Sequence, residues 1–313
     1  MRIYYQNLNC RSGYSPTGGD TLFPGKICLG QIKKHEADAF VFVEAYEKLK
    51  GYEEFCKEAE TLRFRIITST FKEKQNQVMI GIPADLEVSS VTELGEKIET
   101  KGFRVRGINS VLPEEVVAPN YLCVKTKEAT IVGARIPVYS FYNASGMKQL
   151  KKDFNARAAS FEMLTMALNQ DTNGDSRVVV VMDANNARLS GDFYEEFEPR
   201  KYKDYSGKEL AQFNHNFHRV KAAMRNLRFE LKEGENDYSF VYQNLEKEAE
   251  NPGKQFRTYI HDDHCFFRGL PDLTAEFIWD FVSEENGYGK RTNEENLSGL
   301  TGLPDHAGIL VTF

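Results

Sequence analysis

Apolar residues come in short runs along this chain, and their spacing differs from one segment to the next. Residues 38–46 (DAFVFVEAY) and 177–184 (RVVVVMDA) are nearly continuous apolar stretches, which is typical of strands buried on both faces. Residues 150–170 instead place apolar side chains at helical spacing and end at the breaker DTNGDS. The pattern predicts buried strands that alternate with amphipathic helices.

The same two patterns recur over the rest of the chain. Further strands are predicted at residues 2–8, 63–71, 77–84, 238–243, 258–269 and 308–313, with two strands joined by a Lys-Glu turn at 121–140. Further helices are predicted at residues 23–36 and 208–231. There is no internal repeat and no low-complexity linker, so we expect a single domain over residues 1–313 with two β-rich halves. The architecture expected is a layered α/β sandwich, with two sheets inside and helices outside.

Charge and composition exclude some classes of protein. The formal net charge is -6 and the pI about 5.7, which excludes a protein that coats nucleic acid through bulk positive charge. The five cysteines are scattered and form no CxxC pair, so neither a disulfide framework nor a zinc cluster is indicated. No apolar run approaches the roughly 20 residues of a membrane span, and the first residues have a strand pattern rather than that of a signal peptide. We therefore expect a cytoplasmic protein without a membrane span.

Five predicted strands each carry an acid, an amide or an imidazole at one end. These residues are Asn7 and Asn9, Glu44, Asp183 and Asn185, Asp263 and His264, and Asp305 and His306. An unpaired carboxylate beside a buried apolar strand is energetically costly. Each residue alone also has an ordinary explanation, because Asp and Asn are common in turns and Glu44 could cap its strand at the surface. The five strand ends together favour one shared site.

The residues around these strand ends resemble a known family. In chain order, RIYYQNLN, DAFVFVEAY, VVVVMDANNAR, YIHDDHCFF and LPDHAGILVTF resemble the signature blocks of the endonuclease/exonuclease/phosphatase family, which has the DNase-I-like fold. The resemblance runs from residue 1 to residue 313. It implies a four-layered α/β sandwich, with two packed mixed β-sheets flanked by helices. It also implies cleavage of phosphoester bonds with a divalent metal ion, usually magnesium.

The metal ligands implied by the resemblance carry oxygen donors only. We assign Glu44, Asn9 and Asp305 to the metal ion, with Asn7 as the alternative to Asn9. Oxygen ligands suit a hard cation such as Mg²⁺, for which Mn²⁺ can substitute, and no cluster of Cys and His competes. The ion would polarise a phosphoryl oxygen and neutralise the charge that develops during the displacement.

The other residues of the set are assigned to the reaction itself. Asp183 is expected to orient or deprotonate the attacking water, and Asn185 to hydrogen-bond the phosphate and that water. His306, paired to Asp263, would be held in one tautomer and contact a phosphoryl oxygen. Within the family either the Asp or the His is argued to be the base, and we assign the base to Asp183. Asn7 at the end of the first strand completes the catalytic set.

Some positions depart from the family pattern. Arg135 stands in GARIPV where relatives often have His or Tyr, and an Arg can grip a phosphate through two parallel hydrogen bonds. Pro304 stands where the last block usually opens with Ser, and Gln6 where the first block usually has Trp. Asp262 and Asp263 are adjacent, and strand alternation lets only one of them face the site; we choose Asp263.

The substrate is the least determined property. A nuclease acting on DNA or RNA leads, and a phosphatase or phosphodiesterase acting on a small molecule or lipid phosphoester is the alternative. A basic stretch could approach a nucleic-acid backbone or simply be a solvated helix face; it contains His218, Arg219, Lys221, Arg225 and Arg228. A nuclease needs a long basic track, whereas a small-molecule enzyme needs a closed pocket. A scaffold without activity is a third class, which the intact acid and His set disfavours.

Overall fold

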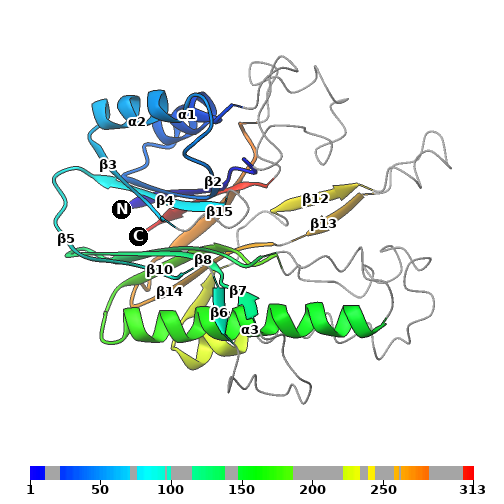
Figure 1. The fold of residues 1–313 in the computed structure, drawn as a ribbon. Coiled ribbons are helices and arrows are strands. Elements are labelled where there is room, and N and C mark those ends of the chain that lie inside the picture. Colours follow the sequence, from blue (N-terminus) through cyan, green and yellow to red (C-terminus); the bar gives the residue numbers. More distant parts are fainter. Residues whose placement is uncertain are drawn as a thin grey trace.

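Two β-sheets lie face to face in this protein, with helices on their outer sides (Figure 1). The computed structural model describes residues 1–10, 22–70, 76–95, 97–99, 115–137, 147–185, 221–232, 239–243, 257–260, 262–281 and 306–313. Both sheets have six strands and mix parallel with antiparallel pairs. The predicted α/β sandwich of two mixed sheets flanked by helices is confirmed.

The first sheet contains both ends of the chain and has the strand order β15-β16-β1-β2-β4-β3. Its strands are β1 (Arg2–Asn7), β2 (Ala39–Ala45), β3 (Phe64–Thr68), β4 (Gln77–Pro83), β15 (Thr274–Ile278) and β16 (Gly308–Thr312). β1 and β2 run parallel, whereas β16 runs antiparallel to β1 and places Ile309 opposite Tyr5. The residues just before β16 are therefore brought to the edge where β1 and β2 end.

The second sheet is built from the middle and late parts of the chain and has the order β11-β14-β10-β9-β8-β5. Its strands are β5 (Val88–Glu93), β8 (Asn120–Thr126), β9 (Thr130–Arg135), β10 (Val178–Asp183), β11 (Glu230–Lys232) and β14 (Asp263–Arg268). Two short pairs form separate two-stranded sheets: β6 (Lys97–Glu99) with β7 (Glu115–Val117), and β12 (Phe240–Gln243) with β13 (Arg257–Ile260).

Helices cover the outer face of each sheet. α1 (Gly25–Lys34) and α2 (Tyr52–Thr61) pack on the first sheet, where Ile32 and Phe55 share an apolar cluster with Phe40 and Phe42. α3 (Met147–Thr172) covers the second sheet, and residues 221–226 are also helical. Among the described helices, none combines the length and the hydropathy that crossing a bilayer requires.

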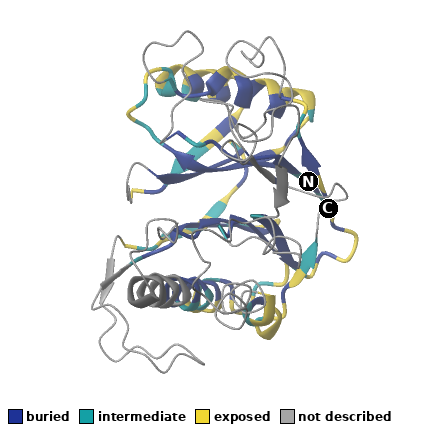
Figure 2. Ribbon diagram, turned by 90° about the vertical axis from the view of Figure 1, so that its right-hand side faces the viewer, coloured by how far each residue is buried: buried dark blue, intermediate teal, exposed yellow. Residues whose placement is uncertain are grey.

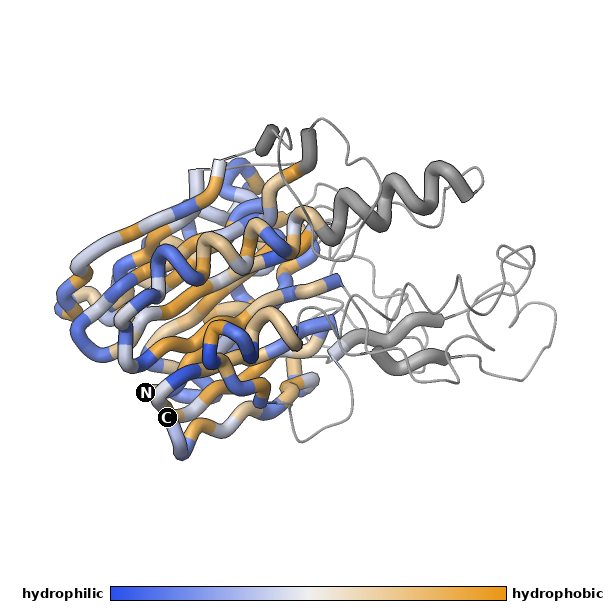
Figure 3. Tube along the Cα trace, turned by 90° about the horizontal axis from the view of Figure 1, so that it is seen from below, coloured by the Kyte–Doolittle hydropathy of each residue, from blue (hydrophilic) through white to orange (hydrophobic). Residues whose placement is uncertain are grey.

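The main core lies between the two sheets. Val41 and Ile80 of the first sheet pack in one cluster with Val179 and Val181 of the second. Buried residues follow the strands of both sheets, and hydrophobic stretches follow the same strands (Figures 2 and 3). The sheets are in close contact at Gly133, where a Cβ atom would lie 2.6 Å from the Cγ1 atoms of Val41 and Val78.

Side-chain alternation along β10 sets the direction of the residue that ends it. Val179 and Val181 belong to the core between the sheets, whereas Val178 and Val180 belong to the cluster on the α3 side. Successive side chains of a strand point to opposite faces, so Asp183, two residues after Val181, points between the sheets. The Asp183 carboxylate therefore lies between the two sheets and faces the first sheet.

Two predicted elements are wrong in part. The helix predicted at 208–231 does not run to its end, because Arg228 has a φ of 63° and β11 begins at Glu230; residues 208–220 lie outside the described residues. The strand predicted at 258–269 is divided into β13 and β14, which pair with different partners. The helix α2 was not expected, because its charged face leaves few apolar positions.

Candidate active site

The polar residues that end the buried strands meet at one edge of the sandwich. Asn7 ends β1, and Glu44 is the last residue but one of β2, the parallel neighbour of β1. In the second sheet Asp183 lies opposite Arg135 on β9 and opposite Asp263 on β14. The register of two sheets therefore assembles residues that are distant in the sequence.

Asp183 is the centre of this cluster and is completely buried. The backbone N–H of Asn185 donates to Asp183 Oδ1 at 2.7 Å, and the Asn185 side chain donates to Oδ2 at 2.8 Å. Asn7 Nδ2 donates to the same Oδ2 atom across the gap between the sheets, at 3.0 Å. The Asn185 amide also donates to the carbonyl of Ile136 at 2.8 Å. Asp183 is thus held in one orientation by groups from both sheets.

Three residues of the site have a left-handed backbone conformation. The φ angles are 47° at Asn9, 53° at Glu44 and 44° at Asn185. Asn tolerates this region because its short side chain bonds locally, and Asn9 N donates to Asn7 Oδ1 at 2.9 Å. A Glu there is strained and persists only when its surroundings hold it. The strand β2 has a register shift between Phe42 and Ala45, and this irregularity turns the Glu44 side chain towards the site.

Glu44 and Arg135 form an ion pair within the site. Arg135 Nε lies 2.6 Å from Glu44 Oε1 and 3.5 Å from Asp183 Oδ2. Asn7 Nδ2 also donates to Glu44 Oε1, at 3.4 Å. Only 7% of the Arg135 side chain and 11% of the Glu44 side chain are exposed, so the pair is largely shielded from water.

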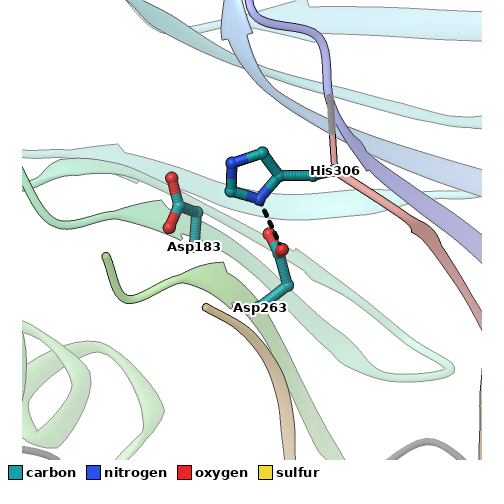
Figure 4. Close-up of side chains that lie close together, drawn as sticks. All are labelled: Asp183, Asp263 and His306. Atoms are coloured by element: carbon teal, nitrogen blue, oxygen red, sulfur yellow. Dashed lines mark hydrogen bonds and ion pairs between the residues drawn. The ribbon is translucent and has the colours of Figure 1, made fainter. Parts of the chain in front are cut away.

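His306 and Asp263 form the second pair of the site (Figure 4). His306 Nδ1 lies 2.6 Å from Asp263 Oδ2, and the ring extends over the space beside Asp183. Tyr5 donates its hydroxyl to Asp263 Oδ1 at 2.7 Å. Gln6 Nε2 donates to the His306 carbonyl at 2.6 Å. Both atoms of the Asp263 carboxylate therefore have partners, and the ring is anchored at its backbone as well.

Ser239 supports this pair from a segment that sequence reasoning did not connect with the site. Its Oγ accepts the N–H groups of Asp262 and Asp263 at 2.9 and 3.0 Å. Its carbonyl accepts the N–H of Ala307 at 2.7 Å. A buried Ser in an acceptor role has no sequence signature, and the same is true of Tyr5 and Gln6 inside an apolar strand.

The charges of the site are unequal. Glu44, Asp183 and Asp263 are three carboxylates, whereas Arg135 is the one permanent cation among the described residues of the cluster. Burial raises the pKa of Asp183 to about 8, opposed by His306 and Arg135 and reinforced by the negative charge of Asp263. A carboxyl with a pKa this close to neutrality is typical of catalytic acids and bases.

Known structures share this fold, although sequence comparison finds no relative. The chain matches no protein-family model and no curated protein. An AP endonuclease from Archaeoglobus fulgidus has a TM-score of 0.55 and 13% identity, with 100% of this chain and 99% of that chain covered. A 3'-5' exonuclease from Neisseria meningitidis has a TM-score of 0.52 and 12% identity, with 100% and 99% covered. TDP2 from D. rerio, complexed with a single-strand DNA product, has a TM-score of 0.54 and 10% identity, with 99% and 97% covered.

The chain has the DNase-I-like fold. The sequence resemblance predicted this fold, and that prediction is confirmed. Identities between 10% and 13% establish the fold alone, so the reaction has to be argued from the site itself.

The donors of this DNase-I-like site fit a divalent metal ion. Ligand atoms of Asp183, Asp263 and His306 all lie within 4.8 Å of one another. Glu44 adds a carboxylate whose Oε2 atom accepts no hydrogen bond from the part of the chain that the structure describes. An excess of buried carboxylates over permanent cations is offset by a bound cation, and oxygen donors suit a hard one.

The structure brings together most of the residues assigned from the sequence. Asn7, Glu44, Arg135, Asp183 and Asn185 form one continuous network. The Asp263 and His306 pair lies beside it, within 4.8 Å of Asp183. Asn9 joins through its backbone alone among the contacts of the described residues. Asp305 lies outside the described residues, as do His218 and Arg219 of the basic stretch.

Proposed function

We propose that this protein is a divalent-metal-dependent hydrolase of phosphodiester bonds, and that its substrate is DNA or RNA. One observation carries the proposal: the buried Asp183 lies within 4.8 Å of a His306 that is paired to Asp263, at the edge where strands of both sheets end. It supports the proposal because a buried carboxylate, a hydrogen-bonded imidazole and several oxygen donors lie around one space. Phosphoryl transfer needs positioned groups and charge stabilisation of this kind.

Asp183 is proposed as the general base. Its pKa of about 8 in the absence of metal lies near neutrality, and a bound cation would favour the ionised carboxylate that accepts a proton from water, because a base works best when its pKa is near the working pH. Asn185 and Asn7 hold the carboxylate by hydrogen bonds to Oδ2, so its direction is set before the substrate binds. Asn185 is proposed to hydrogen-bond the water and the phosphate once these bind, although its amide now donates to Asp183 Oδ2 and to the Ile136 carbonyl.

His306 is proposed to stabilise the phosphoryl group. Its bond to the Asp263 carboxylate fixes the tautomer with Nδ1 protonated and favours the imidazolium form. The positive charge then faces the negative charge that develops on the phosphoryl oxygens. Asp263 acts through His306, and Tyr5 acts through Asp263, so the two are positioning residues.

Glu44, with Asn9 and Asp305, is proposed to hold the metal ion, which we take to be Mg²⁺ with Mn²⁺ as a substitute. When bound, the ion would act as a Lewis acid on the phosphoryl oxygen. The Oε2 atom of Glu44, to which no described residue donates a hydrogen bond, supports its place in this set. Asp305 precedes His306 directly in the sequence, and its place among the metal ligands is proposed from the sequence alone.

A nucleic-acid substrate is supported by charges beyond the catalytic residues. A hollow of about 610 Å³ lies beside β11. Its lining includes three cationic residues, Lys221, Arg225 and Lys232, and two aromatic residues, Phe229 and Phe266. Within the described residues these cations form no ion pairs, and Lys232 lies opposite Cys265, two residues along β14 from Asp263. Cations on and beside the sheet that carries Asp183 and Asp263 favour a polyanion over a single phosphoester.

A phosphatase or phosphodiesterase for a small molecule or lipid phosphoester stays the alternative, because the catalytic groups would be the same. All five cysteines are free and four of them are buried, which agrees with a reducing compartment, and we keep the cytoplasm as the proposed location.

A panel assay tests the proposed function. Plasmid DNA, single-stranded DNA, RNA and an aryl phosphodiester are offered with Mg²⁺, Mn²⁺ or EDTA to the wild type, to His306→Gln and to the control His35→Gln. We expect cleavage of nucleic acid that is lost in EDTA and in His306→Gln alone. Cleavage of the aryl ester without any nucleic acid would favour the alternative, and full activity in EDTA would contradict metal dependence.

A further inference from the structure

Arg135 occupies an unusual place for a cation in a site that is proposed to bind one. It ends β9, lies opposite Asp183 in the register, and turns its side chain between the sheets. Its Nε atom lies 2.6 Å from Glu44 Oε1, the carboxylate proposed to bind the metal, and 3.5 Å from Asp183 Oδ2. The side chain is 7% exposed, so this is a buried contact and not a surface ion pair.

The contact between Arg135 and Glu44 affects metal binding because the guanidinium group of Arg135 is always charged. Arg does not lose its proton in proteins, so the positive charge of Arg135 is permanent. A buried charge needs an opposite charge beside it, because leaving it unpaired is strongly destabilising. Arg135 and Glu44 therefore stabilise each other. Glu44 is also the residue that is proposed to bind the divalent cation.

We infer that Arg135 is a built-in competitor of the metal ion for Glu44. The inference rests on the proposed metal site. While the metal is absent, Arg135 neutralises Glu44 and Asp183 and keeps the carboxylates close together. A metal ion bound at Glu44 Oε2 would bring its charge beside the guanidinium, and one bound through both carboxylate oxygens would have to displace it from Oε1, so the affinity of the site for metal is lower than the carboxylates alone would provide.

Displacement by the metal also frees Arg135 for the substrate. A guanidinium released from Glu44 can form two parallel hydrogen bonds to a phosphate, which a His or Tyr side chain does not provide. Metal loading and phosphate binding are then coupled through one side chain. The coupling makes Arg135 a regulatory element of the site as well as a phosphate ligand.

The test measures Mn²⁺ binding by calorimetry with no substrate present. Arg135→Met keeps an unbranched apolar stem and removes the charge. Arg177→Met is the matched control, because it removes the same charge at the other end of β10, roughly 20 Å along the strand from Asp183. We expect Arg135→Met to bind Mn²⁺ at least about tenfold more tightly than the wild type, because a like charge has been removed from beside the ligand, and Arg177→Met to bind as the wild type does.

A thermal readout accompanies the titration. In EDTA, Arg135→Met is expected to melt at a lower temperature than Arg177→Met, and Mn²⁺ is expected to remove that difference. Mn²⁺ affinity in Arg135→Met equal to or weaker than that of the wild type would overturn the inference, as would absence of binding to both proteins.

A second measurement covers the case in which Arg135→Met does not fold. In the wild type, the NMR resonance of the Arg135 Nε–H is expected to shift on addition of Mg²⁺, while that of Arg177 stays in place. An unmoved Arg135 resonance at saturating Mg²⁺ would contradict the competition. Failure of the proposed function is seen separately, as absence of metal-dependent cleavage of the nucleic acids and the aryl phosphodiester by a wild type that binds Mn²⁺.

Discussion

His306 Nδ1 lies 2.6 Å from Asp263 Oδ2, although the two residues are 43 positions apart in the sequence. His306 precedes β16 of the first sheet, and Asp263 is the first residue of β14 in the second sheet. The pair therefore forms only when the two sheets are packed, and it links the fold directly to the proposed reaction.

Replacement of Asp263 by Asn should leave His306 in place but remove the charge that favours its protonation. We expect kcat on an aryl phosphodiester to fall roughly 100-fold or more, with KM changed little, because the lost interaction acts on the transition state. Steady-state kinetics at saturating Mg²⁺ measure this, with the exposed Asp272→Asn as the control. An unchanged kcat in Asp263→Asn would contradict the proposed role of His306 in the reaction.

Replacement of Tyr5 by Phe should reduce stability more than it reduces activity. The ring stays in the core, but Asp263 Oδ1 loses its donor at a fully buried position. We expect the free energy of unfolding to fall by about 1–3 kcal/mol. Urea denaturation measures it, and Tyr52→Phe, which removes a half-buried bond to Thr68, is expected to change stability less. Equal losses in the two variants would contradict the role of the Tyr5 hydroxyl.

The pKa of Asp183 gives a pH dependence with a definite sign. The ordinary value is 3.8, and burial raises the pKa in the folded protein to about 8. Between these values the unfolded chain has lost the proton and the folded protein keeps it, so the stability from this group is complete below about pH 4 and is lost as pH rises through about 8.

Without metal, Asp183→Asn should therefore flatten the fall in the free energy of unfolding between pH 4 and pH 8, whereas Asp272→Asn should leave it in place. Urea unfolding in EDTA across this range measures the two profiles. Parallel profiles for the wild type and Asp183→Asn would show that the Asp183 carboxyl does not titrate in this window.

Gly133 tests the packing of the sandwich. A Cβ atom there would lie 2.6 Å from atoms of Val41 and Val78 on the facing sheet. We expect Gly133→Ala to destabilise the protein by about 1–3 kcal/mol, as overpacked cores do. In the exposed helical Gly30, by contrast, a Cβ meets nothing within 4 Å, and Gly30→Ala should stabilise by about 0.5–1 kcal/mol. Thermal unfolding distinguishes the two; a neutral Gly133→Ala would contradict the close contact of the sheets.

Acidic residues at the ends of buried strands could be predicted from the sequence where the preceding apolar run was long. Asp183 follows four consecutive Val residues and Glu44 follows a run of apolar residues, so both stood out as acids beside buried strands. Alternation allowed only one of Asp262 and Asp263 to face the site, and Asp263 was chosen because His264 and two aromatic residues follow it; Asp263 is fully buried and bonded to His306.

Other features depend on contacts between segments and leave no local pattern. Tyr5 and Gln6 look like ordinary strand residues until β16 and β14 are placed beside them. Ser239 acts through a hydroxyl that accepts two N–H groups, which its neighbours in sequence do not indicate. The break between β13 and β14 was missed because the residues on both sides have strand propensity. Arg135 was assigned to the phosphate, whereas its pairing with Glu44 emerged from the register of two sheets.

The central claim is that Asp183 and a divalent ion together cleave a phosphodiester bond. The measurement that tests it most directly is single-turnover cleavage of an end-labelled oligonucleotide by the wild type, Asp183→Asn and Asp272→Asn, each with Mg²⁺ and with EDTA. We predict Mg²⁺-dependent cleavage by the wild type and by Asp272→Asn, and a rate at least about 100-fold lower for Asp183→Asn. Cleavage by Asp183→Asn at the rate of the wild type would contradict this claim.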